Sequence, residues 1–438
     1  MNTCIVDLLW GDAGKGKLNH VFCETGEYYY AVRYNGGPNA GHSVCTEDGG
    51  TFKLHQVPVG AVSEKEPFLV LAHGMVLNPV TLWEEIHTLM RANIDIRERT
   101  MISKDAHVIM PWHIAADIKK GGKIGTTKKG IGPTYADKAH RWNAIRMGDL
   151  VEKLKGEKLQ RFFAVDEAFH GEGLWHQYCD AAKMLQSMVG DTGKLLRQAV
   201  SEKKNILFES ANGIHLDIDF GTYPYCTSSG VGPAAIPQAC GLPNLHLNHI
   251  IGVTKVYTTR VGEGPLPSEI CPDTDPIGCR APVGCRAPAP VTKEMLASEK
   301  KDRNGEAFSP ICDCDWCTSH RIREQGGEYG TTTGRPRRIG WLDIDKLIEG
   351  IHYTGATELA LMHVDALCGF KEVGVYIDGN IEMFAGWKLI SDDPNLDKFI
   401  RMIEVRTGLP VSMVSCGPKQ NEIYTRPQSS CSSLGFGL

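Results

Sequence analysis

The sequence lacks any apolar run long enough to cross a membrane as a helix. It also lacks an excess of charge of either sign, since 47 lysines and arginines stand against 52 aspartates and glutamates. With 42% hydrophobic residues, this balance argues against a polyanion-binding surface, a disordered chain and a coiled coil. We therefore expect neither a nucleic acid nor a membrane as a partner.

Room for a signal peptide is also missing, because an apolar run that begins at about Thr3 is expected to form the first strand. This favours a cytoplasmic protein. In that reducing compartment the fifteen cysteines are expected to be thiols or metal ligands rather than disulfides.

Cysteines concentrate in residues 271–323, where GCRAP occurs at 278–282 and again at 284–288. The candidate ligands in this stretch are Cys271, Cys279, Cys285, Cys312, Cys314, Cys317 and His320. They are enough for a structural Zn²⁺ site, but the CxCxxC spacing at 312–317 is irregular. A zinc site and an insertion without metal both remain open.

Short apolar strands alternate with helical patterns along most of the chain. The run at 68–71 is a strand, and Asn78 as N-cap with Pro79 after it starts a helix. Leu82, Ile86 and Leu89 form the apolar stripe of that helix. This alternation predicts an α/β fold with a large, mostly parallel central sheet flanked by helices.

Residues 3–18 have the organisation of a P-loop-like phosphate-binding loop. The apolar run 5–10 leads into GDAGKGK at 11–17, which indicates a strand, a glycine-rich turn and the start of a helix. Leu18 stands where a P-loop would carry a magnesium-binding Ser or Thr, so Asp12 is the nearest candidate metal ligand. A tight turn with solvated lysines is the alternative.

A second glycine-rich loop, NGGPNAGHS at 35–43, follows a β-prone run at 28–34. Its glycines permit close approach of the backbone to a ligand. His42 in this loop is a candidate for proton transfer, because the pKa of a histidine lies near neutrality. The alternative is an ordinary surface histidine.

Three further stretches carry ligand-binding chemistry. Residues 121–150 are rich in glycine, lysine and arginine and indicate either a mobile loop for an anionic ligand or a solvated surface loop. Residues 208–229 offer neutral hydrogen-bonding groups suited to a base or a sugar phosphate. Residues 330–338, GTTTGRPRR, combine hydroxyls with arginines that can grip a dicarboxylate, unless they form a plain basic turn.

Taken together and in order, these stretches resemble the adenylosuccinate synthetase family. The matching motifs are GDAGKGK at 11, NGGPNAGHS at 35, GTTKKGIGPTYADKAHR at 125, FESANGIHLDIDFGTYPYCTSS at 208, KVYTTRVGEGP at 255 and GTTTGRPRR at 330, with weaker HVDAL and SCGP near the end. The resemblance implies a single domain over residues 1–438 with a Cys-rich insertion at about 271–323.

The family resemblance also implies a reaction. Such enzymes phosphorylate the 6-oxygen of a purine monophosphate with a nucleoside triphosphate, and the amine of L-aspartate then displaces the phosphate. Asp12 would take the proton from the ring nitrogen, while His42 and Lys15 would support phosphoryl transfer. Mg²⁺ would be held by Asp12 and Gly41, and the protein would act as a homodimer.

The resemblance assigns the remaining site residues by position. The acceptor nucleotide would be held by Asn39, Thr127, Asn212, Thr227, Arg335 and, from the second subunit, Arg141. Aspartate would be held by Thr332, Thr333, Arg335 and Arg337. The donor nucleotide would be held by Gly14, Lys15, Gly16, Lys17, His42, Asp365, Ser415 and Gly417.

Three positions depart from the family pattern. Members usually have Glu where Ala13 stands, Gln where Asn212 stands and Lys where His363 stands. Asn212 and His363 fall in base-recognition sites, so the acceptor and the donor (GTP, ATP or dATP) stay open.

A related branch, known from bacteriophages that replace adenine with 2-aminoadenine, uses dGMP in place of IMP. The sequence slightly favours dGMP, which would place the protein in a host cytoplasm, with IMP and GTP as the alternative. The competing class is a nucleotide-binding regulatory protein without ligase activity, which would have no need of Arg335 and Arg337.

Overall fold

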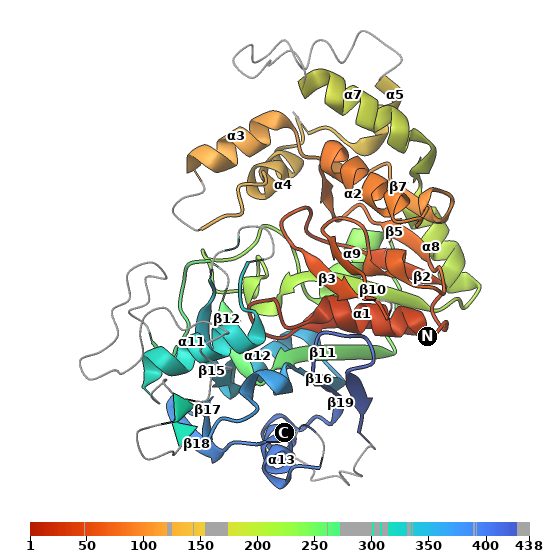
Figure 1. The fold of residues 1–438 in the computed structure, drawn as a ribbon. Coiled ribbons are helices and arrows are strands. Elements are labelled where there is room, and N and C mark those ends of the chain that lie inside the picture. The colour runs from red at the N-terminus through yellow and green to blue at the C-terminus, as the bar shows by residue number, and fades with distance from the viewer. Residues whose placement is uncertain are drawn as a thin grey trace.

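The structure is a computed structural model that describes residues 1–47, 49–120, 125–142, 144–153, 174–260, 262–271, 300–301, 307–308, 314–330, 334, 336–388, 390 and 392–426. The predicted α/β architecture is confirmed, because a large, mostly parallel sheet crosses the molecule with helices on both faces (Figure 1). Within the described ranges, no helix is both long and apolar enough to cross a membrane.

Ten strands form the main sheet in the order β20-β19-β16-β11-β1-β10-β2-β5-β7-β9. Neighbouring strands are parallel except for β19 and β20. The strands are β1 (Asn2–Asp7), β2 (Tyr30–Arg33), β5 (Phe68–Leu71), β7 (Thr100–Ser103), β9 (Val189–Gly190), β10 (Ile206–Gly213), β11 (His249–Lys255), β16 (Glu358–Met362), β19 (Val411–Ser415) and β20 (Ile423–Thr425).

A smaller, four-stranded sheet lies beside the main one and contains β12 (Tyr257–Arg260), β15 (Arg338–Asp343), β17 (Glu372–Ile377) and β18 (Asn380–Ala385). Three strand pairs complete the list: β3 (His42–Cys45) with β4 (Thr51–Leu54), β6 (Val76–Leu77) with β8 (His107–Val108), and β13 (Lys300–Lys301) with β14 (Ala307–Phe308).

The helices are α1 (Lys15–Glu24), α2 (Pro79–Arg91), α3 (Pro111–Lys120), α4 (Ile131–His140), α5 (Met147–Lys153), α7 (Leu174–Leu185), α8 (Thr192–Ser201), α9 (Ile236–Cys240), α11 (Asp315–Gly326), α12 (Ile344–Thr354) and α13 (Pro394–Thr407). Single 3₁₀ turns are η1 (Val59–Val62), η2 (Arg97–Arg99), η5 (Gln186–Met188), η6 (Ile214–Leu216), η7 (Pro233–Ala235) and η8 (Val364–Leu367).

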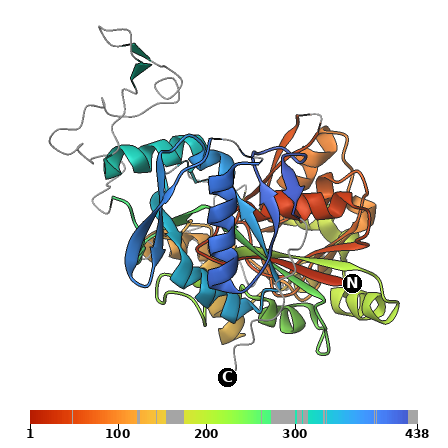
Figure 2. The same ribbon diagram turned by 90° about the horizontal axis from the view of Figure 1, so that it is seen from below.

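Strand β1 buries side chains on both faces of the main sheet. Cys4 and Val6 belong to one hydrophobic core and Ile5 to the other, as the two-residue period of a strand requires. The first core includes side chains of α8, α12 and α13, and the second includes side chains of α1, α2 and α7. Figure 2 shows α13 lying across the face of the sheet.

Several local predictions can be compared with these elements. Helix α2 begins at Pro79, and the Asn78 side chain accepts hydrogen bonds from the backbone N–H groups of Val80 and Thr81, so the predicted cap is confirmed. The apolar residues of LALMHVDALC at 359–368 predict a strand that ends at Asp365, and this prediction is wrong. Strand β16 ends at Met362, because His363 adopts a left-handed conformation (φ 60°), and Asp365 lies in η8.

The parallel arrangement brings the carboxyl ends of β1, β2, β10, β11, β16 and β19 to one edge of the main sheet. Ligands of open α/β sheets bind outside this edge. Strands from both ends of the described chain share the sheet, which favours a single domain, although the domain boundaries stay a prediction.

Candidate active site

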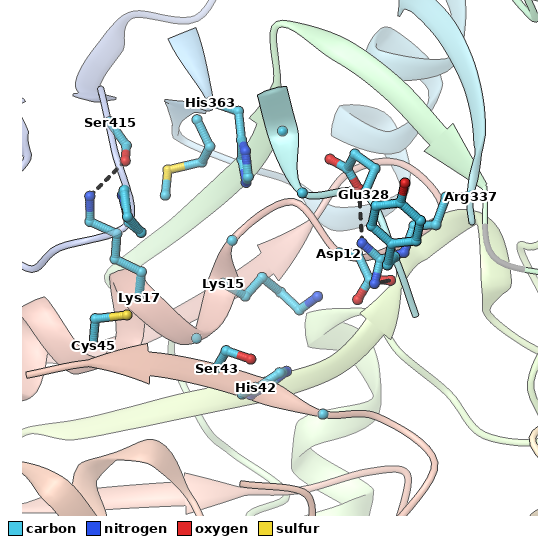
Figure 3. A pocket seen from close by; sticks show the side chains of 18 of the residues that line it. Asp12, Lys15, Lys17, His42, Ser43, Cys45, Glu328, Arg337, His363 and Ser415 are labelled. Atoms are coloured by element: carbon cyan, nitrogen blue, oxygen red, sulfur yellow. Dashed lines mark hydrogen bonds and ion pairs between the residues drawn. The ribbon is translucent and has the colours of Figure 1, made fainter. Parts of the chain in front are cut away.

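A cavity of about 720 Å³ opens at this edge of the main sheet (Figure 3). Its walls come from the loops after β1, β16 and β19, from β3, and from residues 325–330, 334 and 337. Residues predicted from the sequence that line it are Asp12, Gly14, Lys15, Gly16, Lys17, Gly41, His42, Arg337, Asp365, Ser415 and Gly417.

The loop after β1 has the geometry of an anion-binding turn. Gly11, Asp12 and Gly14 have φ values of 97°, 61° and 90°, and α1 begins at Lys15 immediately afterwards. No side chain among the described residues caps this helix, so its first N–H groups are available to phosphate oxygens. Gly16 is needed because a Cβ there would lie 2.9 Å from the Cβ of His42.

Asp7 holds the backbone of this loop in place, and it is not among the residues predicted from the sequence. Its buried carboxylate accepts the backbone N–H groups of Leu9 (2.9 Å), Gly11 (3.2 Å) and Ala13 (2.9 Å) and lies 3.5 Å from Lys15 Nζ. A carboxylate at the end of an apolar strand is rarely buried unless it has hydrogen-bond or ion-pair partners. The position of Asp7 in the apolar run was therefore the signal in the sequence that could have identified it.

The two lysines of the loop differ in their contacts. Lys15 is buried and its side chain extends towards Asp12 in Figure 3. Lys17 Nζ instead donates to Ser415 Oγ (2.8 Å) and to the carbonyls of Gly417 (2.7 Å) and Glu422 (2.8 Å). The described geometry therefore makes Lys17 a link between α1 and the loop after β19, rather than a cation presented to phosphates.

His42 is the first residue of β3 rather than a loop residue. Its Nδ1 lies 2.5 Å from Glu209 Oε1, and Glu209 also lies 3.5 Å from Arg33. Burial and the neighbouring Arg33 lower the pKa of His42, against the opposing effect of Glu209. The imidazole is therefore neutral at physiological pH in this structure.

Asp12 forms an ion pair across the cavity. Arg337 lies 2.8 Å from Asp12 Oδ2 and, through its other terminal nitrogen, 2.8 Å from Glu328 Oε2. Glu328 Oε1 accepts from Lys255 Nζ (2.7 Å) and from the Tyr257 hydroxyl (2.6 Å). Burial alone would raise the pKa of Glu328, but Lys255 and Arg337 outweigh it and lower this pKa to about 2.

His363 and Asp365 line the part of the cavity nearest β16 and β19. Burial lowers the pKa of His363 to about 4, with Lys255 and Arg337 adding to the shift against the opposing effect of Glu328. Burial raises the pKa of Asp365. A neutral imidazole and a carboxyl group with a raised pKa therefore line this part of the cavity.

The predicted acceptor residues lie beside this cavity rather than on its wall. A Cβ on Gly36 would lie 3.7 Å from Asn39 Oδ1 and 3.8 Å from Asn212 Oδ1, so the two amides are close neighbours. Among the described residues, Asn212 Oδ1 is buried without a hydrogen-bond partner. Asn212 has a φ of 68°, a conformation that asparagine tolerates better than glutamine does.

Other predicted residues are not brought to the main cavity. Thr127 lies two residues after Gly125, and Gly125 packs against residues 262–263. Thr227 donates its backbone N–H to the Leu216 carbonyl. Arg141 lines a separate cavity of about 620 Å³ with Lys138 and Arg146. Thr332, Thr333 and Arg335 lie outside the described residues.

Within the described ranges, no group of three or more His, Cys, Asp or Glu side chains could hold a metal ion. Cys279, Cys285 and Cys312 lie outside those ranges, so the zinc prediction has no support from the structure. Asp12 and the backbone of Gly41 both line the main cavity. This sparse oxygen set fits Mg²⁺, which is usually held by one or two carboxylates together with substrate phosphates.

Comparison with known proteins gives one family. The family model described as adenylosuccinate synthetase matches residues 4–388. The adenylosuccinate synthetase of Caldanaerobacter subterraneus subsp. tengcongensis is 35% identical over 467 residues, which cover 96% of this chain and 98% of that protein. That of Listeria welshimeri is also 35% identical, over 96% of this chain and 97% of its own length.

Two solved structures have the same fold. The fully ligated adenylosuccinate synthetase from Plasmodium falciparum matches with a TM-score of 0.77 and 28% identity, over 97% of this chain and 99% of that one. The succinoaminodeoxyadenylate synthetase of cyanophage S-2L, bound to dGMP and dATP, matches with a TM-score of 0.63 and 20% identity. The match covers 98% of this chain and 95% of that one. At that identity the second likeness concerns the fold alone.

Proposed function

Because this chain belongs to the adenylosuccinate synthetase family and is a carbon–nitrogen ligase of that type, we propose that it joins L-aspartate to carbon 6 of IMP with GTP as phosphoryl donor. One observation carries the proposal most directly. Asp12 stands in a single cavity between the phosphate-binding turn at Lys15 and the guanidinium of Arg337.

The first step needs a nucleophilic 6-oxygen and a stabilised phosphoryl group. Asp12 accepts the proton of the purine ring nitrogen, which makes the 6-oxygen able to attack the terminal phosphorus of the donor. Lys15 and the N–H groups at the start of α1 bind phosphate oxygens. Mg²⁺ held by Asp12 and Gly41 would neutralise phosphate charge when bound.

The second step needs aspartate held beside the activated carbon. Arg337 can grip a carboxylate through two parallel hydrogen bonds, and Thr332, Thr333 and Arg335 belong to the same segment. Because Arg337 is bonded to Asp12 in this structure, substrate binding exchanges one carboxylate partner of Arg337 for another. The amine then displaces the phosphate from carbon 6.

The choice of IMP over dGMP rests on the relatives. Adenylosuccinate synthetases are 35% identical over almost the whole chain, whereas the phage enzyme bound to dGMP is 20% identical. The sequence itself slightly favours dGMP, so this is the point at which the comparisons and the sequence differ. We propose that the acceptor is bound by Asn39, Thr127, Asn212 and Thr227. The donor is bound by Asp365, Ser415 and Gly417.

A homodimer is part of the proposal. Arg141 lies at the end of α4 in a cavity of its own, and the adjacent Trp142 is 87% exposed. An exposed tryptophan beside an arginine is typical of a protein interface. Arg141 would then serve the acceptor site of the partner subunit.

The test is phosphate release with Mg²⁺ and aspartate, in four mixtures of GTP or ATP with IMP or dGMP. Turnover with IMP and GTP, and at least about tenfold less with dGMP, is the expected result. Turnover with dGMP alone would overturn the acceptor but keep the ligase chemistry. Phosphate release that does not depend on aspartate would contradict the ligase reaction itself.

A further inference from the structure

Lys17 uses every hydrogen-bond donor of its ammonium group inside the protein. Its Nζ lies 2.8 Å from Ser415 Oγ, 2.7 Å from the Gly417 carbonyl oxygen and 2.8 Å from the Glu422 carbonyl oxygen. An ammonium group carries three N–H donors, and these three acceptors match them. Figure 3 shows the side chain directed towards Ser415, away from Lys15. A phosphate oxygen could therefore bind Lys17 only by displacing one of these bonds.

The three acceptors belong to one tight turn, residues 415–422, which connects β19 to β20. The Cys416 N–H donates to the Glu422 carbonyl oxygen (2.9 Å), and the Glu422 carboxylate accepts the N–H of Lys419 (2.7 Å). A Cβ on Gly417 would lie 2.3 Å from the same carboxylate, so the turn closes tightly around it. These contacts give the 415–422 turn its shape, and the bonds from α1 determine where the turn lies.

The first turn of α1 is also held from the side of β3. A Cβ on Gly16 would lie 2.9 Å from the Cβ of His42 and 3.2 Å from the Ser43 carbonyl oxygen, so the helix packs closely on that strand. At the end of β3, the backbone of Cys45 forms a β-bridge with Lys419 of the 415–422 turn. Helix α1, β3 and the turn therefore support one another around the cavity.

This arrangement joins the two ends of the proposed donor site. At one end, the phosphate-binding turn at 11–14 leads directly into Lys15, the first residue of α1. At the other end, where the donor base is proposed to bind, Asp365 and residues of the 415–422 turn line the same cavity. Lys17 follows the phosphate end in the chain and bonds to the base end, so one side chain sets the distance between them.

We propose that Lys17 is a positioning residue for the phosphoryl donor: it holds the 415–422 turn against α1, so that the base and the triphosphate of one nucleotide reach their subsites together. This inference rests on the proposed function, which assigns both ends of the cavity to one donor. Phosphate oxygens are left to Lys15, whose Nζ lies 3.5 Å from Asp7, and to the N–H groups at the start of α1. Loss of Lys17 therefore weakens binding of the base and leaves the phosphate contacts in place.

The main test measures by calorimetry how Lys17→Met binds GTP and inorganic triphosphate, each with Mg²⁺ and without acceptor or aspartate. Methionine has a similar length but no N–H donor, so the turn loses its bonds to α1. We expect the Kd for GTP to rise at least about tenfold and the Kd for inorganic triphosphate to change less than about threefold. An equal rise in both values would show that Lys17 contacts phosphate. That result, or an unchanged Kd for GTP, would overturn the inference.

Lys53→Met is the matched control, because Lys53 on β4 lines the same cavity but lies outside the 415–422 turn. The lost charge acts on both ligands alike, so the ratio of the two Kd values should stay at its wild-type value. A change of this ratio as large as in Lys17→Met would reduce the effect to one of charge and remove the role of the turn. The expected ratios in a protein that turns over no purine monophosphate would contradict the proposed function alone.

Hydrogen exchange tests the inference where Lys17→Met binds neither ligand. Opening of the turn should raise the exchange rates of the Cys416 and Lys419 N–H groups at least about tenfold, while the N–H groups bonded to Asp7 keep their wild-type rates. Lys17→Arg is the milder variant, because its donors are spread over a plane and cannot meet all three acceptors, and it should change the rates in the same direction. Wild-type exchange of the turn in both variants would show that Lys17 does not position it.

Discussion

At the scale of single residues, Arg337 joins the two chemical tasks of the cavity. One terminal nitrogen contacts Asp12, the proposed base, and the other contacts Glu328, which is itself fixed by Lys255 and Tyr257. Because Glu328 holds one side of the guanidinium, the other side can exchange Asp12 for a substrate carboxylate without losing its orientation.

Replacing Arg337 with Leu should therefore weaken aspartate binding far more than nucleotide binding. Loss of a bidentate, charge-assisted contact costs about 3 kcal/mol or more, so we expect the KM for aspartate to rise at least about 100-fold. The Kd for GTP, measured by calorimetry, should change by less than about threefold. Arg338→Leu is the matched control, because Arg338 pairs with Glu269 instead. An unchanged KM in Arg337→Leu would remove its assignment.

Asp12→Asn tests the other side of the same ion pair. The amide can still accept a hydrogen bond from Arg337, so the fold of the loop should survive. The proton acceptor is lost, and we expect the rate of phosphoryl transfer to fall by about 10²- to 10⁴-fold. Rapid-quench measurement of the phosphoryl intermediate reports this step directly. Normal turnover of the variant would show that another group is the base.

Side chains in the glycine-rich motifs could be predicted from the sequence to line the cavity, but their buried partners could not. Asp12, Lys15 and His42 stand in glycine-rich motifs whose composition indicates a ligand. Asp7, Glu209 and Glu328 instead make their contacts inside the fold; Glu209, for example, bonds a residue 167 positions away. Contacts between residues so far apart in the chain depend on the order of the strands in the sheet, and the local sequence pattern does not determine that order.

At the scale of elements, the alternation of strands and helices sufficed to predict a parallel sheet, and the cap at Asn78 sufficed to predict the start of α2. The end of β16 was missed because nothing in HVDAL marks the left-handed conformation of His363. That turn moves Asp365 out of the strand and into the cavity wall.

The contact of Glu328 with β11 and β12 should make the fold sensitive to acid. The pKa of Glu328 falls from 4.5 to about 2 on folding, so its charged form stabilises the fold above pH 4.5. This contribution, at most about 3 kcal/mol, is lost as the pH falls through the range from 4.5 to 2.

Urea unfolding at a series of pH values measures this dependence. Glu328→Gln should be less stable than the wild type near neutrality, and its free energy of unfolding should fall less steeply below pH 4.5. Glu382→Gln, on the exposed strand β18, is the control and should follow the wild type. Parallel curves for Glu328→Gln and the wild type would show that folding does not shift the pKa of Glu328.

At the scale of the whole molecule, the proposed dimer can be tested by mixing two inactive variants. Asp12→Asn lacks the base and Arg141→Ala lacks the residue that would cross to the partner. A mixed dimer then contains one complete site, and statistical mixing should restore about a quarter of the wild-type activity. Each variant alone should stay inactive. No recovery, in a mixture shown to exchange subunits, would place Arg141 outside the partner's site.

The family and the reaction type were predictable from the order of the motifs along the whole chain, whereas the acceptor was not. The residues proposed to recognise the acceptor base come from separate segments, among them Asn39 in a loop and Asn212 in β10, and only the fold determines the distance between them. The conformation of Asn212 gives a backbone reason for asparagine at that position. A departure from a family motif can therefore reflect the backbone rather than a change of substrate.

The position of β1 has a consequence for biosynthesis. It leaves the ribosome well before its neighbours in the main sheet, which are β10, beginning at Ile206, and β11, beginning at His249. Its backbone therefore stays unpaired with these strands until the chain has been synthesised as far as Ile206, since parallel partners pair only across long stretches of chain. Nascent chains of this protein should need protection by a chaperone until β10 has been synthesised, and a ribosome stalled before that point would carry an incomplete sheet.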